Sequence, residues 1–211
     1  MAFPETNLLD GFNRADENPL AGIWSSTKTY STGGSTTTQL QTNQIRQAAT
    51  LSSSHTIQAY PQDQECWVTI STLANSDDVE VNARIRDPSA AGAIDLYQWV
   101  YFVATTSWRI FRIEDGSGAG IGPNPTTPVL AAGDSIGMRL RGSTIEGWHK
   151  PAAGAWTLIV SHVDGSPLIH PGPIGVGMND ADQAWRLDDF GGGAIGGADI
   201  RASGLGRGRI R

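Results

Sequence analysis

The sequence Asp134-Ser-Ile-Gly-Met-Arg-Leu-Arg-Gly-Ser-Thr-Ile-Glu-Gly-Trp148 gives the strongest indication of the fold class of this 211-residue chain. Ile136, Met138 and Leu140 alternate with small or charged residues, which is the period of a β-strand with one buried face. The pair Gly142-Ser143 then supplies a turn, and a second alternating run follows it. The segment therefore predicts a β-hairpin.

The same alternation recurs along the rest of the chain. It predicts strands over residues 67–73 and 79–86, a long strand over 94–104 and a strand over 108–113 that is antiparallel to it. The stretch 116–128, rich in Gly and Pro, is predicted to be a loop without any element. About a dozen short strands at this spacing indicate an all-β protein with two antiparallel sheets packed as a sandwich.

The composition limits the function classes. The hydrophobic fraction is 39% and the charged fraction 17%, and the net charge of −6 argues against a nucleic-acid binder. The single Cys66 excludes an intramolecular disulfide and any Cys-based zinc site. No run is long and apolar enough for a membrane span, and the first residues lack the features of a signal peptide. We therefore expect a protein made in the cytoplasm without membrane insertion.

Three short motifs add to this pattern. They comprise Asp10, Phe12, Asn13 and Arg14 near the start, Gly133, Asp134, Ile136, Arg139, Gly142 and Ile145 in the hairpin, and Leu187, Asp188, Asp189 and Phe190 near the end. Together they resemble the concanavalin-A-like lectin/glucanase superfamily, in particular its laminin-G-like jelly rolls. The resemblance implies an antiparallel two-sheet jelly roll over residues 1–190, in a fold that carries lectins, hydrolases and structural modules alike.

The composition changes after Phe190. Residues 191–211 hold eight Gly and the arginines Arg201, Arg207, Arg209 and Arg211. A Gly-rich segment loses much entropy on ordering, so one interpretation is a tail without fixed structure. The interpretation that we favour is an extended arm that docks on a neighbouring subunit through Arg–carboxylate pairs.

Isolated jelly rolls without export signal or disulfides resemble structural proteins of tailed-bacteriophage virions. The leading hypothesis is accordingly a non-enzymatic virion protein, such as a capsid decoration protein, a head fibre or a tail component. Its expected partners are other virion proteins, further copies of itself and host surface glycans. A carbohydrate-binding adhesion module is the second hypothesis, and a glycoside hydrolase of the same superfamily is the third.

The sequence lacks a recognisable catalytic set. Glycosidases of this superfamily carry the pattern Glu-x-Asp-x-x-Glu on one strand, and the nearest match here is Asp78 with Glu80. No third acid follows and Asp78 is predicted to lie at a turn, so both residues are interpreted as solvated. No nucleophile elbow accompanies the four scattered histidines, and Cys66 is expected to be a small core residue. We therefore expect no enzymatic activity.

The candidate metal and ligand sites are less specific. Asn179, Asp180 and Asp182 form an oxygen-rich turn that is a candidate calcium site, although calcium needs more ligands than these three provide, and no other cofactor is expected. Tyr97, Trp99 and Tyr101 share one face of a predicted strand. Asn82 and Arg84 share the outward face of another. These five residues are the candidate glycan or partner contacts, with a role in the core or an interface favoured over glycan binding.

Overall fold

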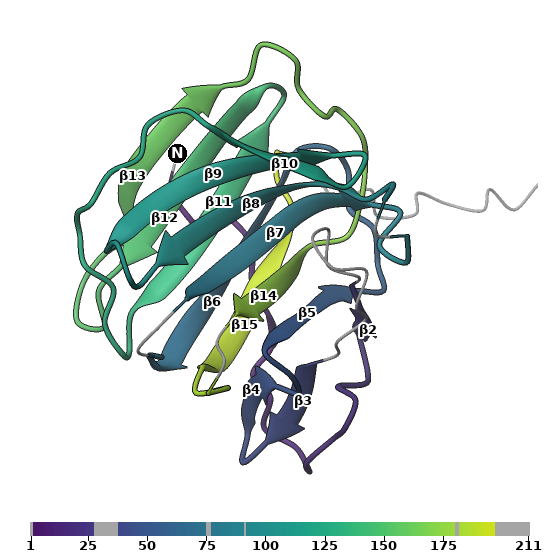
Figure 1. Cartoon of the computed structure of the whole chain (residues 1–211), viewed down its shortest axis with the longest axis vertical. Coiled ribbons are helices and arrows are strands. Elements are labelled where there is room, and N and C mark those ends of the chain that lie inside the picture. The colour runs from purple at the N-terminus through teal and green to yellow at the C-terminus, as the bar shows by residue number, and fades with distance from the viewer. Residues whose placement is uncertain (1, 28–37, 75–76, 91, 180–181, 197–211) are drawn as a thin grey trace, which may run out of the picture.

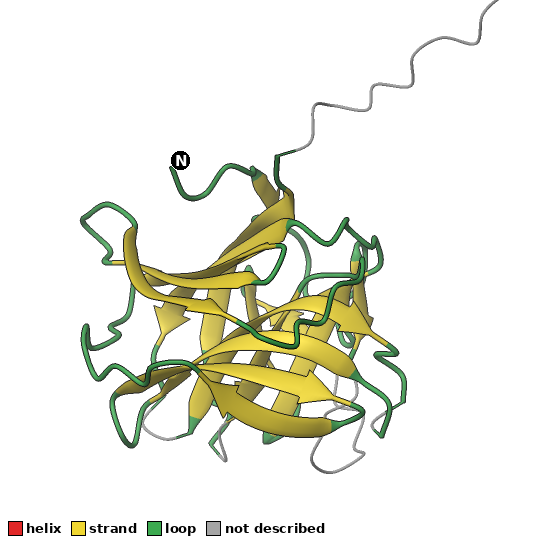
Figure 2. Ribbon diagram, turned by 90° about the horizontal axis from the view of Figure 1, so that it is seen from above, coloured by secondary structure: helices red, strands yellow, loops and turns green. Residues whose placement is uncertain are grey.

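The computed structural model describes residues 2–27, 38–74, 77–90, 92–179 and 182–196. Two antiparallel sheets lie face to face in it (Figures 1 and 2). The first sheet contains β1 (Leu8–Asp10), β3 (Thr38–Gln41), β4 (Gln44–Gln47), β6 (Gln64–Thr72), β11 (Ser135–Arg141), β12 (Thr144–Lys150), β13 (Thr157–Val163) and β15 (Arg186–Ala194). The second contains β2 (Trp24–Ser26), β5 (Leu51–Thr56), β7 (Asp78–Arg86), β8 (Asp95–Phe102), β9 (Ser107–Glu114), β10 (Ser117–Ile121) and β14 (Gly175–Asn179). The predicted two-sheet β-sandwich is confirmed.

The strand order joins segments that lie far apart in the sequence. The first sheet runs β13-β12-β11-β6-β15-β4-β3, with β1 paired to β15, and the second runs β10-β9-β8-β7-β14-β5-β2. The first and last strands therefore lie side by side, as the resemblance implied. The described residues form no helix, and so none that could cross a membrane.

The predicted hairpin is β11 and β12, joined at Gly142 and Ser143. Ile136, Met138 and Leu140 are completely buried between the sheets, as their alternation predicts. The stretch 116–128 differs from its prediction, because Ser117–Ile121 forms β10 and pairs with β9. Four of its five residues are Ser, Gly or Ala, so this edge strand gave no apolar alternation to detect.

The core is built around large aromatic side chains of the second sheet. The rings of Trp99 and Trp108 stack with centroids 5.2 Å apart, and Tyr101 packs on Trp108 at 4.6 Å. A Cβ atom at Gly147, on β12 of the opposite sheet, would lie only 2.6 Å from the Trp99 ring. The two sheets therefore come into close contact where this glycine faces this tryptophan.

A β-bulge in β7 reverses its inside–outside pattern near the end of the strand. The register to β8 shifts between Ala83 and Arg86, and Arg84 has a positive φ of 50°. The Arg84 side chain consequently turns inward and is 0% exposed, although its position in the alternation predicts an outward side chain. Its guanidinium donates to the carbonyls of Gln62, Leu168 and Gly142. The outward orientation predicted for Arg84 is wrong for this reason.

A buried ion pair ties the first residues to the outer face of the first sheet. Arg139 Nη2 lies 2.9 Å from Glu65 Oε2, and Glu65 Oε1 accepts hydrogen bonds from the Thr6 amide and hydroxyl. The Phe3 ring stacks on Trp148 at 4.9 Å, above Gly137. The chain's own N-terminal segment therefore covers the part of this face over β6, β11 and β12.

The boundary of the sandwich lies beyond the predicted residue 190. β15 continues to Ala194, and Gly191, Gly192 and Gly193 pair with β6. A Cβ atom at Gly191 would collide with the Trp67 indole, so a glycine is needed for this pairing. The first residues of the predicted arm thus belong to the sheet, and the arginines Arg201, Arg207, Arg209 and Arg211 lie outside the described residues.

We predict that Trp99→Ala destabilises the whole sandwich. Removing a fully buried Trp leaves a cavity between the sheets, and the free energy of unfolding should fall by about 3–5 kcal/mol. Urea denaturation measures this change. Trp156→Ala, at a partly exposed site, is the matched control and should cost clearly less; equal losses in the two variants would contradict the assignment of Trp99 to the core.

Candidate functional site

The outer face of the second sheet carries a row of polar side chains along β7. Val79 and Val81 point into the core, so Asp78, Glu80 and Asn82 point to the opposite side by the period of two. None of these three lies in a loop, since β7 begins at Asp78. Strand geometry therefore places two carboxyl groups and an amide in one line.

The neighbouring strands complete a polar floor around Glu80. Gln98 of β8 lies directly opposite Asn82, and Gly177 of β14 lies opposite Glu80 on the other side. A Cβ atom at Gly177 would collide with the Glu80 carboxyl group, so this glycine leaves the space into which that group extends. We name Asp78, Glu80, Asn82 and Gln98 the polar floor.

Hydrogen bonds within the polar floor leave two of its acceptors without a partner in the described part of the chain. Asn82 Nδ2 donates to Glu80 Oε1 at 3.2 Å, and the Gln98 side chain also bonds to Glu80. Both amide groups are buried, with 1% of Asn82 and 2% of Gln98 exposed. Asn82 Oδ1 and Gln98 Oε1 nevertheless have no hydrogen-bond partner among the described residues. Two buried acceptors at the centre of this face are thus unsatisfied by the residues that the structure describes.

Burial raises the pKa of both carboxyl groups in the polar floor. For Glu80, burial and then the neighbouring Asp78 raise the pKa to about 8, against the opposing effect of the two amide donors. For Asp78, burial raises the pKa to about 6, while a hydrogen bond with Asn179 opposes the shift. Glu80 is therefore largely protonated at neutral pH. The interpretation of these two residues as solvated turn residues is wrong.

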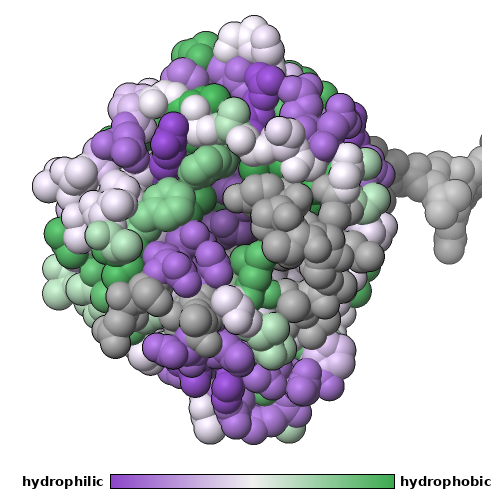
Figure 3. Space-filling view, in the orientation of Figure 1, coloured by the Kyte–Doolittle hydropathy of each residue, from purple (hydrophilic) through white to green (hydrophobic). Residues whose placement is uncertain are grey.

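Aromatic and cationic side chains lie next to the polar floor. The rings of Phe102 and Phe111 meet edge to face at 6.0 Å, and the Arg109 guanidinium lies 5.4 Å from the Phe111 ring centroid. Arg109 Nε is buried and has no acceptor among the described residues. In Figure 3 a hydrophilic area occupies the middle of this face, with apolar area beside it. The face thus combines apolar ring surface with free donors and acceptors.

His55 of β5 belongs to the other side of the same face. It pairs with Gly175, the β14 residue that also lies opposite Asn82. Its Nδ1 lies 2.8 Å from the Thr27 hydroxyl, and burial lowers its pKa to about 4. His55 is therefore neutral at physiological pH and adds no positive charge to this face.

The aromatic residues predicted to bind a ligand lie in the interior. Tyr97, Trp99 and Tyr101 do share one face of β8, but they are 0%, 0% and 1% exposed and contact the opposite sheet. Gln98, Val100 and Phe102 alternate with them and lie on the outer face of the second sheet. These three aromatic residues therefore lie in the core, which is the role favoured for them over glycan binding, and they are not surface contacts for a glycan.

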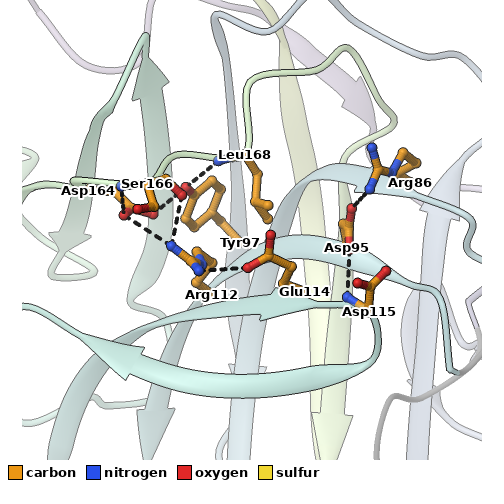
Figure 4. A network of polar contacts seen from close by, with 9 residues as sticks. All are labelled: Arg86, Asp95, Tyr97, Arg112, Glu114, Asp115, Asp164, Ser166 and Leu168. Atoms are coloured by element: carbon orange, nitrogen blue, oxygen red, sulfur yellow. Dashed lines mark hydrogen bonds and ion pairs between the residues drawn. The ribbon is translucent and has the colours of Figure 1, made fainter.

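Tyr97 has a structural role that Figure 4 shows. Its hydroxyl donates to Asp164 Oδ2 at 2.6 Å and accepts from the Leu168 amide at 2.9 Å. Arg112 reaches the other oxygen of Asp164 at 3.3 Å and also pairs with Glu114. Burial, followed by the bond to Asp164, raises the pKa of Tyr97, so the hydroxyl stays protonated. This network holds the connection between β13 and β14 at the end of the sandwich.

Of the predicted site residues that the structure describes, Asn82 belongs to the polar floor and Asn179 lies beside it. Asn179 bonds to Asp78 at the end of β14, whereas Asp180 lies outside the described residues and Asp182 lies in a turn. The described part of the chain holds no group of three or more His, Cys, Asp or Glu side chains arranged for a metal ion. Calcium binding at this turn stays a prediction.

Sequence reasoning missed Gln98, Phe102, Phe111 and Arg109. A signal existed for Asn82, which was predicted on an outward strand face, and Glu80 lies two residues before it on that face. No pattern along one strand could show that Gln98 lies opposite Asn82, since that fact depends on the register between two strands.

The comparisons with known proteins agree on the fold. No family model and no curated protein matches the sequence. Among solved structures, the carbohydrate-binding module CBM66 from Bacillus subtilis matches with a TM-score of 0.57 and 12% identity, covering 82% of this chain and 96% of that one. The Bacillus licheniformis β-glucanase gives 0.58 and 13% identity over 88% and 96%. The Ca²⁺-bound exoplasmic/lumenal domain of VIP36 gives 0.63 and 11% identity over 92% and 91%.

These three structures are similar to this chain over almost the whole sandwich, at identities that carry the fold alone. The chain therefore has the concanavalin-A-like jelly-roll fold.

Proposed function

We propose that the protein is a non-enzymatic carbohydrate-binding module whose ligand lies on the outer face of the second sheet, across β7, β8 and β14. The observation that carries the proposal is the pair of buried, unpartnered amide oxygens of Asn82 and Gln98. Leaving such acceptors unpaired is unfavourable, and a ligand that brings hydroxyl donors relieves the cost. Sugars present many hydroxyl groups in fixed positions.

The surroundings of the polar floor fit the same ligand class. A protonated Glu80 both donates and accepts hydrogen bonds, as a sugar hydroxyl requires. The Phe102 and Phe111 side chains offer apolar surface against which the C–H face of a sugar ring packs, and Arg109 supplies a further donor. The polar floor thus provides hydrogen bonds, and the two aromatic rings provide apolar contact area.

The names of the similar structures support this choice of ligand class. One is a carbohydrate-binding module, and VIP36 is also known in a Ca²⁺/Man2-bound form, which matches this chain with a TM-score of 0.59. Because their identity to this chain is so low, the proposed ligand class depends on the polar floor of this chain itself.

The second candidate function is glycoside hydrolysis. It is favoured by the position of Asp78 and Glu80 two residues apart on one strand face, with pKa values raised to different extents, and by the similar β-glucanase structures. The third acid of the superfamily pattern is missing, and Asn82 is the next residue of the same face. We therefore place binding ahead of hydrolysis.

The virion hypothesis remains a prediction, as do a cytoplasmic origin and assembly with capsid, tail or identical subunits. Neither the fold nor the comparisons bear on it, and a jelly roll that binds host glycans is compatible with it. A reconstruction of the native particle, showing the neighbours of residues 195–211, would decide it.

We predict that Asn82→Ala and Gln98→Ala each weaken sugar binding by roughly three- to tenfold. This loss of affinity corresponds to the net free energy of one hydrogen bond. The binding sugar is first identified on a glycan array that includes mannosides and β-glucans, and affinities are then measured by calorimetry. Gln44→Ala on β4 is the matched control and should bind as the parent does. Unchanged affinity in both floor variants, with melting temperatures preserved, would exclude this face as the binding site.

Glu80→Gln separates binding from hydrolysis. Glutamine keeps the shape and neutral charge of protonated Glu80, so sugar binding at neutral pH should persist within about a factor of three. The parent protein should release no reducing sugar from mixed-linkage β-glucan. Turnover by the parent that disappears in Glu80→Gln would establish the hydrolase instead.

The raised pKa of Glu80 predicts how stability depends on pH. In the unfolded chain this carboxyl group ionises near its ordinary value of 4.5, whereas in the folded chain it stays protonated to about pH 8. Between these values only the unfolded state has lost the proton, so the free energy of unfolding falls as pH rises, by at most about 1.4 kcal/mol per pH unit. Urea denaturation from pH 5 to 9 should show this decline in the parent and a clearly shallower one in Glu80→Gln. Parallel curves would contradict the burial of this group.

A further inference from the structure

An apolar cavity opens on the surface at the other end of the second sheet. It has a volume of about 350 Å³ and is lined by Leu9, Gly22, Ile23, Thr56, Ile57, Gln58 and Tyr60. The Ile57 amide donates to the Ile23 carbonyl, which holds these two residues side by side. Ile57 is 66% exposed and Ile23 40%, so the described residues leave this apolar surface open. Exposed apolar surface that surrounds a cavity is typical of a docking site.

The chain leaves the sandwich next to this cavity. Gly193, near the end of β15, lies close enough to the Tyr60 ring that a Cβ atom there would be 3.6 Å from it. The Ile195 amide then donates to the Asp63 carbonyl at 3.1 Å. Because Tyr60 also lines the cavity, residue 196 is tethered at its edge.

The segment that follows has the composition to occupy the cavity. Residues 197–211 carry the aliphatic side chains Ile200, Leu205 and Ile210 among glycines, and their four arginines and one aspartate give a net charge of +3. Five extended residues span about 17 Å, so Ile200 can reach a cavity that begins at Tyr60. The cavity lining itself has no charged residue.

Acidic side chains flank the cavity and match the positive charge of the segment. Asp63, at the point of exit, has 44% of its side chain exposed. Asp10 follows the cavity residue Leu9 directly. Burial raises the pKa of Asp188, and the neighbouring carboxylates of Asp189 and Asp10 raise it further. Asp10 is already paired with Arg14, so an arginine of the segment would add favourable charge chiefly at Asp188 and Asp189.

We propose that residues 197–211 fold back and dock in the cavity between β1, β2 and β5 of the same chain, with Ile200 as the apolar anchor and the arginines against Asp63, Asp188 and Asp189. Docking within one chain is favoured over docking on a second copy because the tether is only a few residues long. A short tether gives an effective concentration in the millimolar range, so even a weak contact is populated.

The test compares the full chain with a chain ending at residue 196, by hydrogen–deuterium exchange and by light scattering after size exclusion. If the segment occupies the cavity about three-quarters of the time, exchange in residues 56–60 should be roughly fourfold faster in the shortened chain. Both chains should be monomers. A synthetic peptide of residues 197–211 should restore the slow exchange in the shortened chain, whereas the same peptide with Ile200→Asp should not.

A matched pair of surface variants completes the experiment. In the full chain, Ile57→Asp should accelerate exchange in residues 56–60 as truncation does, whereas Val163→Asp, at a similarly exposed position on β13, should leave it unchanged. Equal exchange in the full and shortened chains would overturn the proposal. A full chain that is dimeric and becomes monomeric on truncation would also overturn it, because the occupant would then belong to a second copy.

Discussion

The packing of Trp99 and Trp108 against the opposite sheet determines which side of the second sheet meets solvent. The two stacked rings fill the space below Gly147 and cannot be turned outward without opening a large cavity. Because side chains alternate strictly along a strand, an inward Trp99 requires an outward Gln98, and the register to β7 then places Asn82 beside it. The candidate ligand site is thus a geometric consequence of the core.

The polar floor lowers the free energy of unfolding, and the packing of the core offsets this loss. Two amides are buried and two carboxyl groups are partly buried on one sheet face, and the raised pKa of Glu80 reflects that cost. The neighbouring amides reduce it by donating to Glu80, but each then has its oxygen without a partner. A folded protein tolerates such an arrangement only where the rest of its packing is strong, and it is typical of sites that bind something.

Much of the fold could be predicted from the sequence, because alternation over seven or more residues is a strong signal. The hairpin of β11 and β12 and the strand β7 are the clearest examples. The candidate site was harder to predict from the sequence, for three physical reasons. Both faces of β8 carry large apolar residues, so alternation identified the two faces of that strand without showing which one is inside. The bulge at Arg84 reversed the pattern within one strand. The meeting of Asn82 with Gln98 depends on inter-strand register, which no single strand encodes.

The chemistry of Glu80 also bears on the choice between binding and hydrolysis. A carboxyl group that acts as a nucleophile must be ionised, and Glu80 is largely protonated at neutral pH. It could serve only as a general acid, with Asp78 as its ionised partner, and would then have to reach the glycosidic oxygen of a bound sugar. One of its oxygens already accepts a hydrogen bond from Asn82, which limits how the group can rotate toward a ligand. A protonated carboxyl group held in this way is better suited to a fixed hydrogen bond with a sugar hydroxyl than to repeated proton transfer.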